Sequence, residues 1–365
     1  MSLHTAFRER QSAETVGIGV DLAGNCNIGC VQCYFARYPG ARSYLSLEQF
    51  KQIVAASTGT FRELYLLGGE PTLNPELEQI VAHGLQHFEF VLLVTNGLRF
   101  ADAQYCRRIA QPGLHLSMHR RAISKDAAEL VDQLARKAGT FKRSCQAWDN
   151  VSRFWCGNVY AHINLLRPLV SGRHVHEVFI WARQHQYEPV VEMVKSGPEF
   201  VRGNQLDLTA AEVGQVYLEL ANIDAVQFGN SADGRIVPPT YASGCTLIET
   251  SLHIKLDGTV VPCVGVDFIG YGSAFNGGIQ QALTSPLRAA IRDYRTWIVG
   301  PCRNCPLFDQ CHGGCRGNAF AQTGCPRASD PYCWRHTPDL TLRSMVPATC
   351  RGCPLQLHPG CSIKV

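Results

Sequence analysis

The sequence predicts an α/β fold in which six β/α units curl into a partial barrel, followed by a cysteine-rich region with little regular structure. Two observations support this prediction. From residue 16 to about residue 200, short β-rich runs alternate with amphipathic helical stretches. Inside several of these runs, polar side chains alternate with apolar ones, which indicates a sheet with one apolar face and one polar face.

Six segments are predicted to be strands. Each is short and apolar, and helical segments separate them, which is typical of parallel strands because parallel neighbours need a long connection. The predicted strands cover residues 16–22, 63–67, 88–94, 113–118, 158–166 and 188–194.

The segments between these strands have helical periodicity. Ser46 with Gln49 three residues later forms the pattern of a capping box, which predicts that a helix begins there. The predicted helices cover residues 46–57, 75–85, 101–110, 124–138 and 174–186.

Polar residues inside the last three predicted strands favour a curled sheet over an open one. Apolar faces would pack on helices, and the polar faces would line a ligand cavity. Hydrogen-bonded core residues without a ligand role are the alternative, since buried polar groups usually find partners. The polar residues that share the inner face are His115, Ser117, His119, Tyr160, His162, Asn164 and Glu192.

Three cysteines, Cys26, Cys30 and Cys33, follow the first predicted strand with the spacing CxxxCxxC. Such a loop can hold a 4Fe-4S cluster and leave its fourth iron without a protein ligand, because these clusters normally take four cysteines. Structural zinc is an alternative, but it usually needs four donors, and after Cys33 no further Cys or His occurs before His83. A disulfide framework fits poorly, since 17 cysteines in 365 residues fall into groups typical of metal sites.

The turns after the second and third predicted strands fall at the carboxyl ends of the sheet, where α/β folds bind ligands. The second strand is followed by Gly68, Gly69, Glu70 and Pro71, and the third by a turn that contains Asn96. Paired glycines allow the backbone to approach a bound molecule closely. Glu70 is expected to accept a hydrogen bond from an ammonium group.

Together, the cysteine loop, the GGEP turn and the six-unit partial barrel resemble the radical S-adenosylmethionine (SAM) superfamily over residues 16–200. The resemblance implies a TIM-like (β/α)6 barrel. It also implies that the amino and carboxylate groups of SAM bind the open iron, that an electron cleaves SAM, and that a 5′-deoxyadenosyl radical removes hydrogen from a substrate.

The same resemblance implies which residues contact SAM. Gly68, Gly69 and Glu70 would receive the methionyl ammonium, with Pro71 and Asn96 in the adjoining turns. Ser117 and Asn164 match strand-end positions that often touch the ribose or the carboxylate. The family often has an aromatic residue where this chain has Gln32, and Tyr34 is expected to compensate in the packing around adenine.

A second group of cysteines lies in the C-terminal third. Spacing alone leaves a zinc site open as an alternative. The order of seven cysteines resembles the SPASM extension of radical SAM enzymes, which holds two auxiliary 4Fe-4S clusters. By that resemblance the first auxiliary cluster takes Cys245, Cys263 and Cys315, and the second takes Cys302, Cys305, Cys311 and Cys333.

Four further cysteines have open roles. Cys325 could be the fourth ligand of the first auxiliary cluster, or that site could stay open toward substrate. Cys350, Cys353 and Cys361 echo the spacing at residues 302–307 and could bind another metal, complete a neighbouring cluster or bind nothing. The predicted segments are an N-terminal segment 1–15, the radical SAM barrel 16–205, a linker with a bridging helix 206–240, the SPASM domain 241–340 and the tail 341–365.

The resemblance favours an oxidoreductase or maturase that oxidises or cross-links a peptide or natural-product substrate. A small-molecule epimerase or dehydrogenase is the alternative, with Cys145, Cys156 or Cys325 as hydrogen donor, although such cysteines are often simply small buried residues. A non-catalytic iron-sulfur carrier or redox sensor would explain the cysteines but not the GGEP turn. Only 25 residues precede Cys26, so we expect no N-terminal peptide-binding module.

Charge and hydropathy limit the partners. The net charge of +4 comes without a dense Lys/Arg run, which argues against nucleic acid. No apolar run reaches the roughly 18 residues of a membrane span, and the polar N-terminus lacks a secretory signal. We expect a cytoplasmic protein that is reduced by a low-potential electron donor such as flavodoxin or ferredoxin.

Overall fold

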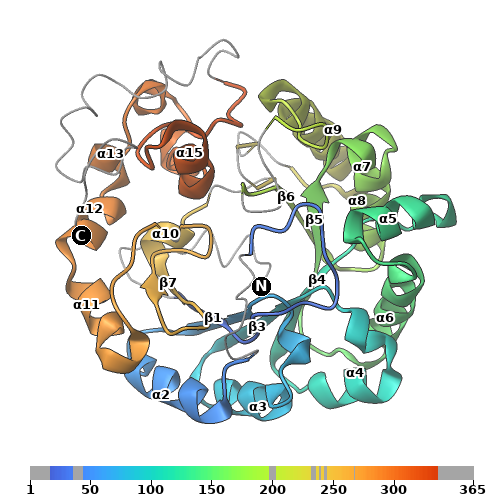
Figure 1. Cartoon of the computed structure of the whole chain (residues 1–365). Coiled ribbons are helices and arrows are strands. Elements are labelled where there is room, and N and C mark those ends of the chain that lie inside the picture. Colours follow the sequence, from blue (N-terminus) through green and yellow to red (C-terminus); the bar gives the residue numbers. More distant parts are fainter. Residues whose placement is uncertain are drawn as a thin grey trace.

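A computed structural model describes residues 17–35, 44–196, 203–231, 236–237, 240–241, 245–266 and 268–335 of the chain. In this part of the chain, six parallel strands form a curved sheet (Figure 1). All six predicted strands are present, each within two residues of its predicted bounds. They are β1 (Gly17–Asp21), β2 (Glu63–Leu67), β3 (Phe90–Thr95), β4 (Leu114–His119), β5 (Val159–Leu165) and β6 (Glu188–Met193).

The sheet does not end at β1. Its order among the described residues is β6-β5-β4-β3-β2-β1-β7-β8, with β7 (Ser251–Ile254) parallel to β1 and β8 (Val260–Val261) antiparallel to β7. Gly17 pairs with Ser251, and Val20 pairs with Ile254. The C-terminal third of the chain therefore extends the sheet that the first 200 residues build.

Helices cover the outer face of the sheet (Figure 1). The capping box predicted at Ser46 is confirmed, since Gln49 N donates to Ser46 Oγ at 3.2 Å and Ser46 N donates to Gln49 Oε1 at 3.2 Å. The helices of this part are α2 (Leu47–Ser57), α3 (Leu77–His87), α4 (Ala103–Ile109), α5 (Ala128–Ala135), α6 (Thr140–Phe154), α7 (Arg167–Ser171) and α8 (His174–Gln184), with 3-10 turns η1 (Pro71–Leu73), η2 (Leu98–Ala101) and η3 (Lys125–Ala127).

The helix predicted over residues 124–138 is shorter than expected. It consists of η3 and α5, and α6 follows as a separate helix that the sequence did not predict. The side chains of Phe141, Trp148 and Val151 are buried on one face of α6, but charged and polar residues dominate the rest of it. Ile18, Val20 and other branched residues on the outer face of the sheet are fully buried and belong to the hydrophobic core.

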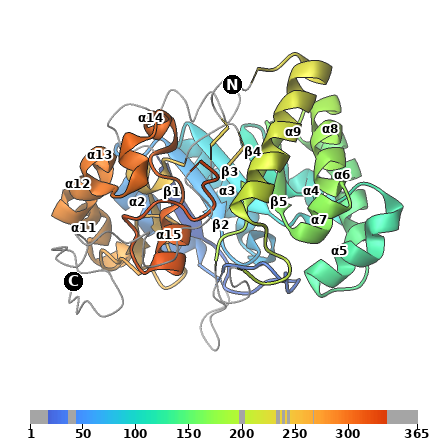
Figure 2. The same ribbon diagram turned by 90° about the horizontal axis from the view of Figure 1, so that it is seen from above.

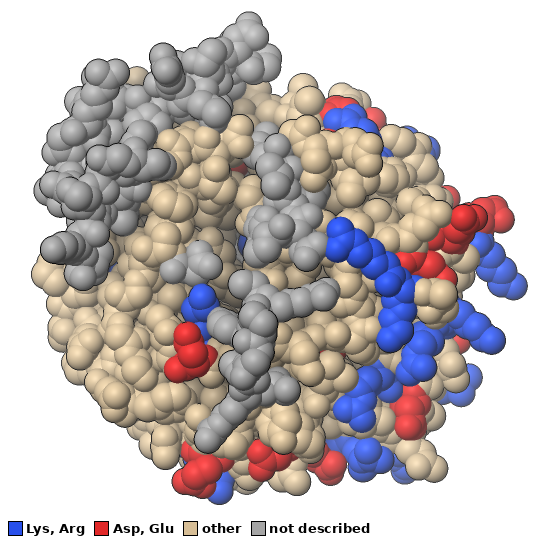
Figure 3. Space-filling view, viewed as in Figure 1, with Lys and Arg blue, Asp and Glu red and all other residues tan. Residues whose placement is uncertain are grey.

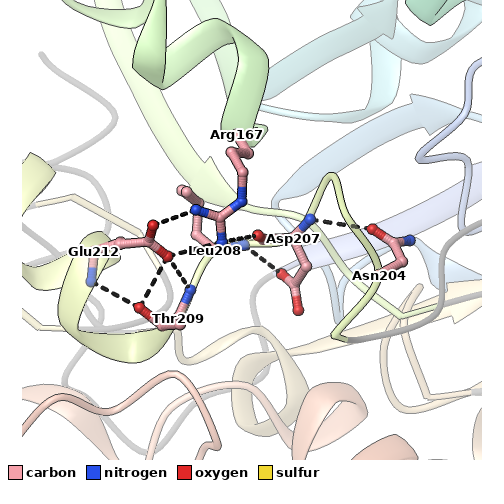
Figure 4. Close-up of polar contacts among 6 residues, drawn as sticks. All are labelled: Arg167, Asn204, Asp207, Leu208, Thr209 and Glu212. Carbon is pink, nitrogen blue, oxygen red and sulfur yellow. Dashed lines mark hydrogen bonds and ion pairs between the residues drawn. The ribbon is translucent and has the colours of Figure 1, made fainter.

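Helix α9 (Ala210–Phe228) begins where the linker meets the barrel, and a second capping box fixes its start (Figure 4). Glu212 N donates to Thr209 Oγ1, and Thr209 N donates to Glu212 Oε2 at 2.7 Å. Arg167, at the start of α7, forms an ion pair with Glu212 and also donates to the backbone oxygen of Asp207 at 2.6 Å. These contacts attach the linker to the carboxyl end of β5.

The C-terminal third consists of short helices joined by turns. Figure 2 shows them at one end of the curved sheet, with α5 to α9 at the other end. None of the helices in the described ranges is long and apolar enough to cross a membrane. The C-terminal elements are α10 (Leu247–Thr250), η4 (Ala274–Asn276), α11 (Gly278–Thr284), α12 (Pro286–Arg292), α13 (Tyr294–Trp297), η5 (Pro301–Asn304), α14 (Phe308–Cys311) and α15 (Arg316–Thr323).

Candidate functional site

A cavity of about 290 Å³ opens at the carboxyl ends of the strands. Its wall combines the cysteine loop, the turns after β2 and β3, the inner side chains of β4 to β6, and residues of β7. Segments as far apart in the chain as residues 19 and 264 therefore share one site. The predicted site residues in its lining are Cys26, Cys30, Cys33, Tyr34, Gly68, Gly69, Glu70, Asn96, Ser117, Asn164 and Cys263.

The cysteine loop is held in place by the end of α5. Gly29 N donates to Ala135 O at 2.9 Å, and Val31 N donates to Leu134 O at 3.0 Å. All three cysteines of the loop line the cavity, are partly exposed and form no disulfide. The loop thus presents three sulfurs to one space, which is the arrangement that its spacing predicts.

The paired glycines allow the turn after β2 to pack against the cysteine loop. Gly69 N donates to Ala23 O at 2.7 Å, and Glu70 N donates to Asn25 O at 2.9 Å. A methyl group on Gly69 would lie 2.4 Å from Asn25 O, and Gly68 has φ of 127°, where side chains are strained. The paired glycines were expected to let the backbone approach a ligand. In the structure they also let the turn after β2 approach the cysteine loop.

Glu70 lies at the centre of this packing and is fully buried. Its Oε1 accepts from Thr72 N at 3.0 Å and from the hydroxyls of Thr72 and Thr95, both at 2.5 Å. Its Oε2 accepts from Asn96 N at 2.9 Å. Burial raises the pKa of Glu70, while these hydrogen bonds oppose the rise. The carboxylate therefore links the turns after β2 and β3, in addition to lining the cavity.

Asn96 extends the link to the cysteines. Its side-chain nitrogen lies 2.7 Å from Asn27 Oδ1 and 3.6 Å from Cys26 Sγ. Burial and then the charge of Glu70 raise the pKa of Cys26 to about 12. A thiol in this position ionises at neutral pH only beside a cation, and the iron of a bound cluster would supply that charge.

The inner face of the sheet is polar near the carboxyl ends of the strands. His162 Nε2 lies 2.9 Å from Glu192 Oε1, and its Nδ1 lies 3.4 Å from Ser117 Oγ. The rings of His119 and His162 are 4.3 Å apart, and burial followed by the charge of His162 holds the pKa of His119 well below its usual value. Asn164 Nδ2 is 3.5 Å from His162 Nε2.

Two of the seven polar residues expected on the inner face lie outside the cavity lining. His115 stacks on Phe90, and Tyr160 packs with Tyr65 and Leu92 near the amino ends of the strands. The inner face is therefore apolar at its base and polar only toward the cysteine loop. His115 and Tyr160 follow the alternation but sit too deep to meet a ligand.

Several lining residues were not singled out in the sequence. Lys195 follows β6 and bonds Glu192 at 3.1 Å, Arg121 follows β4 and donates to Cys30 Sγ at 2.9 Å, and His253 of β7 lies 3.0 Å from Asp21. The signal for the first two was their position, because each follows the carboxyl end of a strand. Nothing local marks His253, since its place depends on a strand pairing across the whole chain.

Unpartnered polar atoms indicate that this cavity suits a polar ligand. Gln32 Oε1, Arg121 Nε and Ser251 Oγ are buried without a hydrogen-bond partner among the described residues, and all three side chains line the cavity. Such atoms are costly unless a ligand or water bonds them. Within the described ranges, no three His, Cys, Asp or Glu side chains converge as for a single ion. A cluster instead binds each thiolate at a separate iron, so the residues fit a cluster with SAM beside it.

The three cysteines assigned to the first auxiliary cluster lie close together. Burial raises the pKa of Cys245, and the neighbouring charges of Cys263 and Cys315 raise it further. Cys263 precedes a tight turn in which Val266 N donates to Cys263 O at 2.9 Å, and it also lines the main cavity. This group of thiols therefore borders the same space as the cysteine loop.

The four cysteines assigned to the second auxiliary cluster form another group. Burial raises the pKa of Cys311, and the charges of Cys302 and Cys333 raise it further. Burial also raises the pKa of Cys302, and the charge of Cys305 adds to that rise. Cys302 Sγ lies 3.0 Å from Ser329 Oγ. These thiols come from η5, α14 and the turn before residue 335.

Two buried charged residues organise the loops of both groups. The Arg316 guanidinium donates to the backbone oxygens of Pro326 at 3.0 Å and Ala328 at 2.6 Å. Asp330 accepts from Cys315 N at 2.6 Å, and its neighbour Tyr332 donates to Asp207 at 2.5 Å. The segment that carries Cys333 is thereby attached to the linker before α9.

The remaining predicted site residues lie elsewhere. Pro71 is buried at the start of η1 and does not line the cavity. Cys145 lies 3.5 Å from Arg120, Cys156 is exposed before β5, and Cys325 packs with Val299, Ala319 and Ala328, so none of these three thiols lines the cavity. Cys350, Cys353 and Cys361 fall outside the described residues.

Comparisons with known proteins agree with this geometry. Residues 20–167 match the radical SAM superfamily, and residues 245–306 match the iron-sulfur cluster-binding domain SPASM. The chain is 26% identical over 337 residues to the PqqA peptide cyclase of Methylocella silvestris, covering 87% of each protein. It is also 26% identical over 331 residues to the mycofactocin maturase MftC of Mycolicibacterium smegmatis, covering 86% of this chain and 81% of the maturase.

Solved structures share the fold. Streptococcus suis SuiB bound to S-adenosylmethionine aligns with a TM-score of 0.67 at 14% identity, over 90% of this chain and 80% of SuiB. Native anSMEcpe with bound AdoMet aligns with a TM-score of 0.65 at 15% identity, over 87% of this chain and 94% of anSMEcpe. Both alignments extend well beyond the six-stranded barrel into the C-terminal third.

Proposed function

This chain is a radical SAM superfamily enzyme with a C-terminal SPASM domain, and from that premise we propose that it modifies a peptide substrate by radical chemistry. The observation that carries the proposal is the shared cavity, which brings the cysteine loop, the GGEP turn and Cys263 to one space. The peptide class is supported by the two relatives named as a peptide cyclase and a maturase. Radical SAM and SPASM domains imply SAM and 4Fe-4S clusters as cofactors.

We assign Cys26, Cys30 and Cys33 as ligands of the SAM-binding cluster. When bound, this cluster and SAM together supply a 5′-deoxyadenosyl radical that removes hydrogen from a substrate C–H bond. The GGEP turn would hold the methionyl end, and Arg121 provides a cation beside Cys30 in the cysteine loop. Ser117 and Asn164 would hold the ribose or the carboxylate from the inner face.

The Cys245 group and the Cys302 group would hold the two auxiliary clusters. Cys263 borders the cavity, so the first of them would lie next to the substrate. Cys325 packs in a small apolar cluster and is left out of this assignment. About 12 irons per chain after anaerobic reconstitution would support three clusters, and about 16 would add the tail cysteines.

The test uses the full chain, reconstituted anaerobically with iron and sulfide. With SAM and dithionite, 5′-deoxyadenosine should accumulate, whereas a carrier or redox sensor would produce none. A synthetic peptide copied from a short reading frame beside this gene should then become two hydrogens lighter. In deuterated buffer, a product that takes up deuterium from solvent and is not two hydrogens lighter would indicate epimerisation. That result would contradict oxidation or cross-linking.

We propose further that a low-potential donor such as flavodoxin delivers the electron, in the cytoplasm. Four exposed cations, namely Arg136, Lys137, Lys142 and Arg143, lie at the junction of α5 and α6, and the end of α5 is bonded to the cysteine loop. Lys137 Nζ donates to Asn27 O within that loop at 2.8 Å. Figure 3 shows Lys and Arg gathered over this side of the molecule. Acidic donor proteins suit such a surface because opposite charges steer association.

Reversing two of these charges should slow reduction by flavodoxin. For the double variant Lys142→Glu/Arg143→Glu we expect a roughly tenfold lower rate of flavodoxin-driven 5′-deoxyadenosine formation at low salt, and a smaller loss at high salt. The rate with dithionite should be unchanged. A matched control is Arg107→Glu/Arg153→Glu, whose exposed cations end the helices that lead into β4 and β5. Equal losses in both variants would reject this docking surface.

A further inference from the structure

Lys195 is a cation, with 22% of its side chain exposed, between the main cavity and the first auxiliary group of cysteines. Its ammonium lies 3.1 and 3.3 Å from the two oxygens of Glu192, and 5.3 Å from the centre of the Tyr34 ring. All three side chains line the cavity.

The stem of Lys195 packs against the turn that follows Cys263. A methyl group on Gly265 would lie 3.5 Å from Lys195 Cδ. The next residue of the chain, Ser196, donates its backbone N–H to Asn318 Oδ1 at 3.2 Å. The end of β6 is thus in direct contact with both chain segments that carry Cys263 and Cys315.

Those two segments also contact each other. A methyl group on Gly317 would lie 2.3 Å from Gly265 O and 3.7 Å from Cys315 Sγ. The glycines leave no side chain between the Cys263 turn and the start of α15. Lys195 therefore packs on the turn that follows Cys263, and Gly265 places no side chain between them.

The electrostatics of the four groups agree with this placement. Burial lowers the pKa of Lys195, but Glu192 and then Tyr34, Cys315 and Cys263 outweigh burial, so the pKa lies above its usual value and the ammonium stays charged. Burial raises the pKa of each thiol in the first auxiliary group, and Lys195 opposes that rise in all three: Cys245, Cys263 and Cys315.

We propose that Lys195 raises the reduction potential of the auxiliary cluster held by Cys245, Cys263 and Cys315. A reduced cluster carries one more negative charge than the oxidised cluster, so a fixed ammonium beside it stabilises the reduced form. Nearby charge and hydrogen bonding are the means by which a protein sets such potentials. The inference rests on the proposed function, because it requires a cluster at these three cysteines.

Redox titration followed by electron paramagnetic resonance tests this role in the reconstituted full chain. In Lys195→Met, the ratio of reduced to oxidised first auxiliary cluster at a fixed solution potential should fall about tenfold, equivalent to ~59 mV for a one-electron couple. Lys195→Arg keeps the charge and should change the ratio less than threefold. Lys51→Met removes an exposed lysine on α2 and should leave this ratio unchanged. The other two clusters should titrate as in the unaltered protein.

The result that overturns the proposal is an unchanged ratio in Lys195→Met at full iron content. Weaker SAM binding with an unchanged ratio would also overturn it, by assigning Lys195 to the cofactor. If Lys195→Met loses iron, Lys195→Gln serves as the second neutral variant and is judged by the same ratio. Should Cys263→Ala and Cys315→Ala retain all the iron of the unaltered chain, the cluster assignment fails first and the role of Lys195 fails with it.

Discussion

Alanine in place of Cys30 is expected to abolish SAM cleavage. The thiol lies in the cavity beside Arg121, and its loss leaves two cysteines in a loop that supplies three. Because enzymes accelerate their reactions by ~10⁶-fold or more, loss of the cofactor site should reduce 5′-deoxyadenosine formation at least about a thousandfold. The iron content should fall by about four per chain. Both quantities are measured on anaerobically reconstituted protein with dithionite as reductant.

Cys156→Ala is the matched control for this variant. Cys156 is exposed before β5 and does not line the cavity, so cleavage and iron content should match those of the unaltered chain. If Cys30→Ala retained cleavage, the cysteine loop could not hold the cofactor site. If both variants lost iron equally, the loss would reflect general sensitivity of the protein to cysteine replacement.

The second large effect is expected from Glu70→Ala, and it concerns stability. The substitution leaves the N–H groups of Thr72 and Asn96 and the hydroxyls of Thr72 and Thr95 without their buried acceptor. Each orphaned buried donor costs about 1–3 kcal/mol, and four donors lose their acceptor here. We expect the free energy of unfolding to fall by about 3–5 kcal/mol in urea titrations.

Two further variants serve as comparisons for this measurement. Glu48→Ala removes an exposed carboxylate from α2 and should change the free energy of unfolding by less than about 0.5 kcal/mol. Glu70→Gln keeps the side-chain shape but offers an amide nitrogen to one of the donors, so it should be intermediate. A loss under about 1 kcal/mol in Glu70→Ala would mean that the turns after β2 and β3 hold together without this carboxylate.

Local signals in the sequence were sufficient for the barrel. Strand and helix bounds depend on periodicity and on caps such as Ser46, which are properties of neighbouring residues. Helix α6 was missed because only a few of its residues, such as Phe141 and Trp148, mark a buried face among many charged ones. The spacing of the cysteines likewise pointed to their grouping without knowledge of the fold.

The rest depended on contacts between distant residues. The parallel pairing of Gly17 with Ser251 has no local signal, and neither does the 3.0 Å contact between Asp21 and His253 that it creates. Glu70 was expected to face a ligand, but its four protein donors come from turns that meet only in the folded chain. Nothing in the sequence distinguishes Lys195 from other lysines, because its position depends on packing against the turn that follows Cys263.

The pairing of β1 with β7 also affects how the chain folds during its synthesis. A ribosome delivers β1 long before β7, so during that interval one side of β1 presents unpaired N–H and C=O groups. Such an open edge invites pairing with other chains, and closure over so long a loop is slow. The nascent protein should therefore depend on chaperones until its last third emerges, and its yield should respond to translation speed and temperature more than that of an isolated barrel.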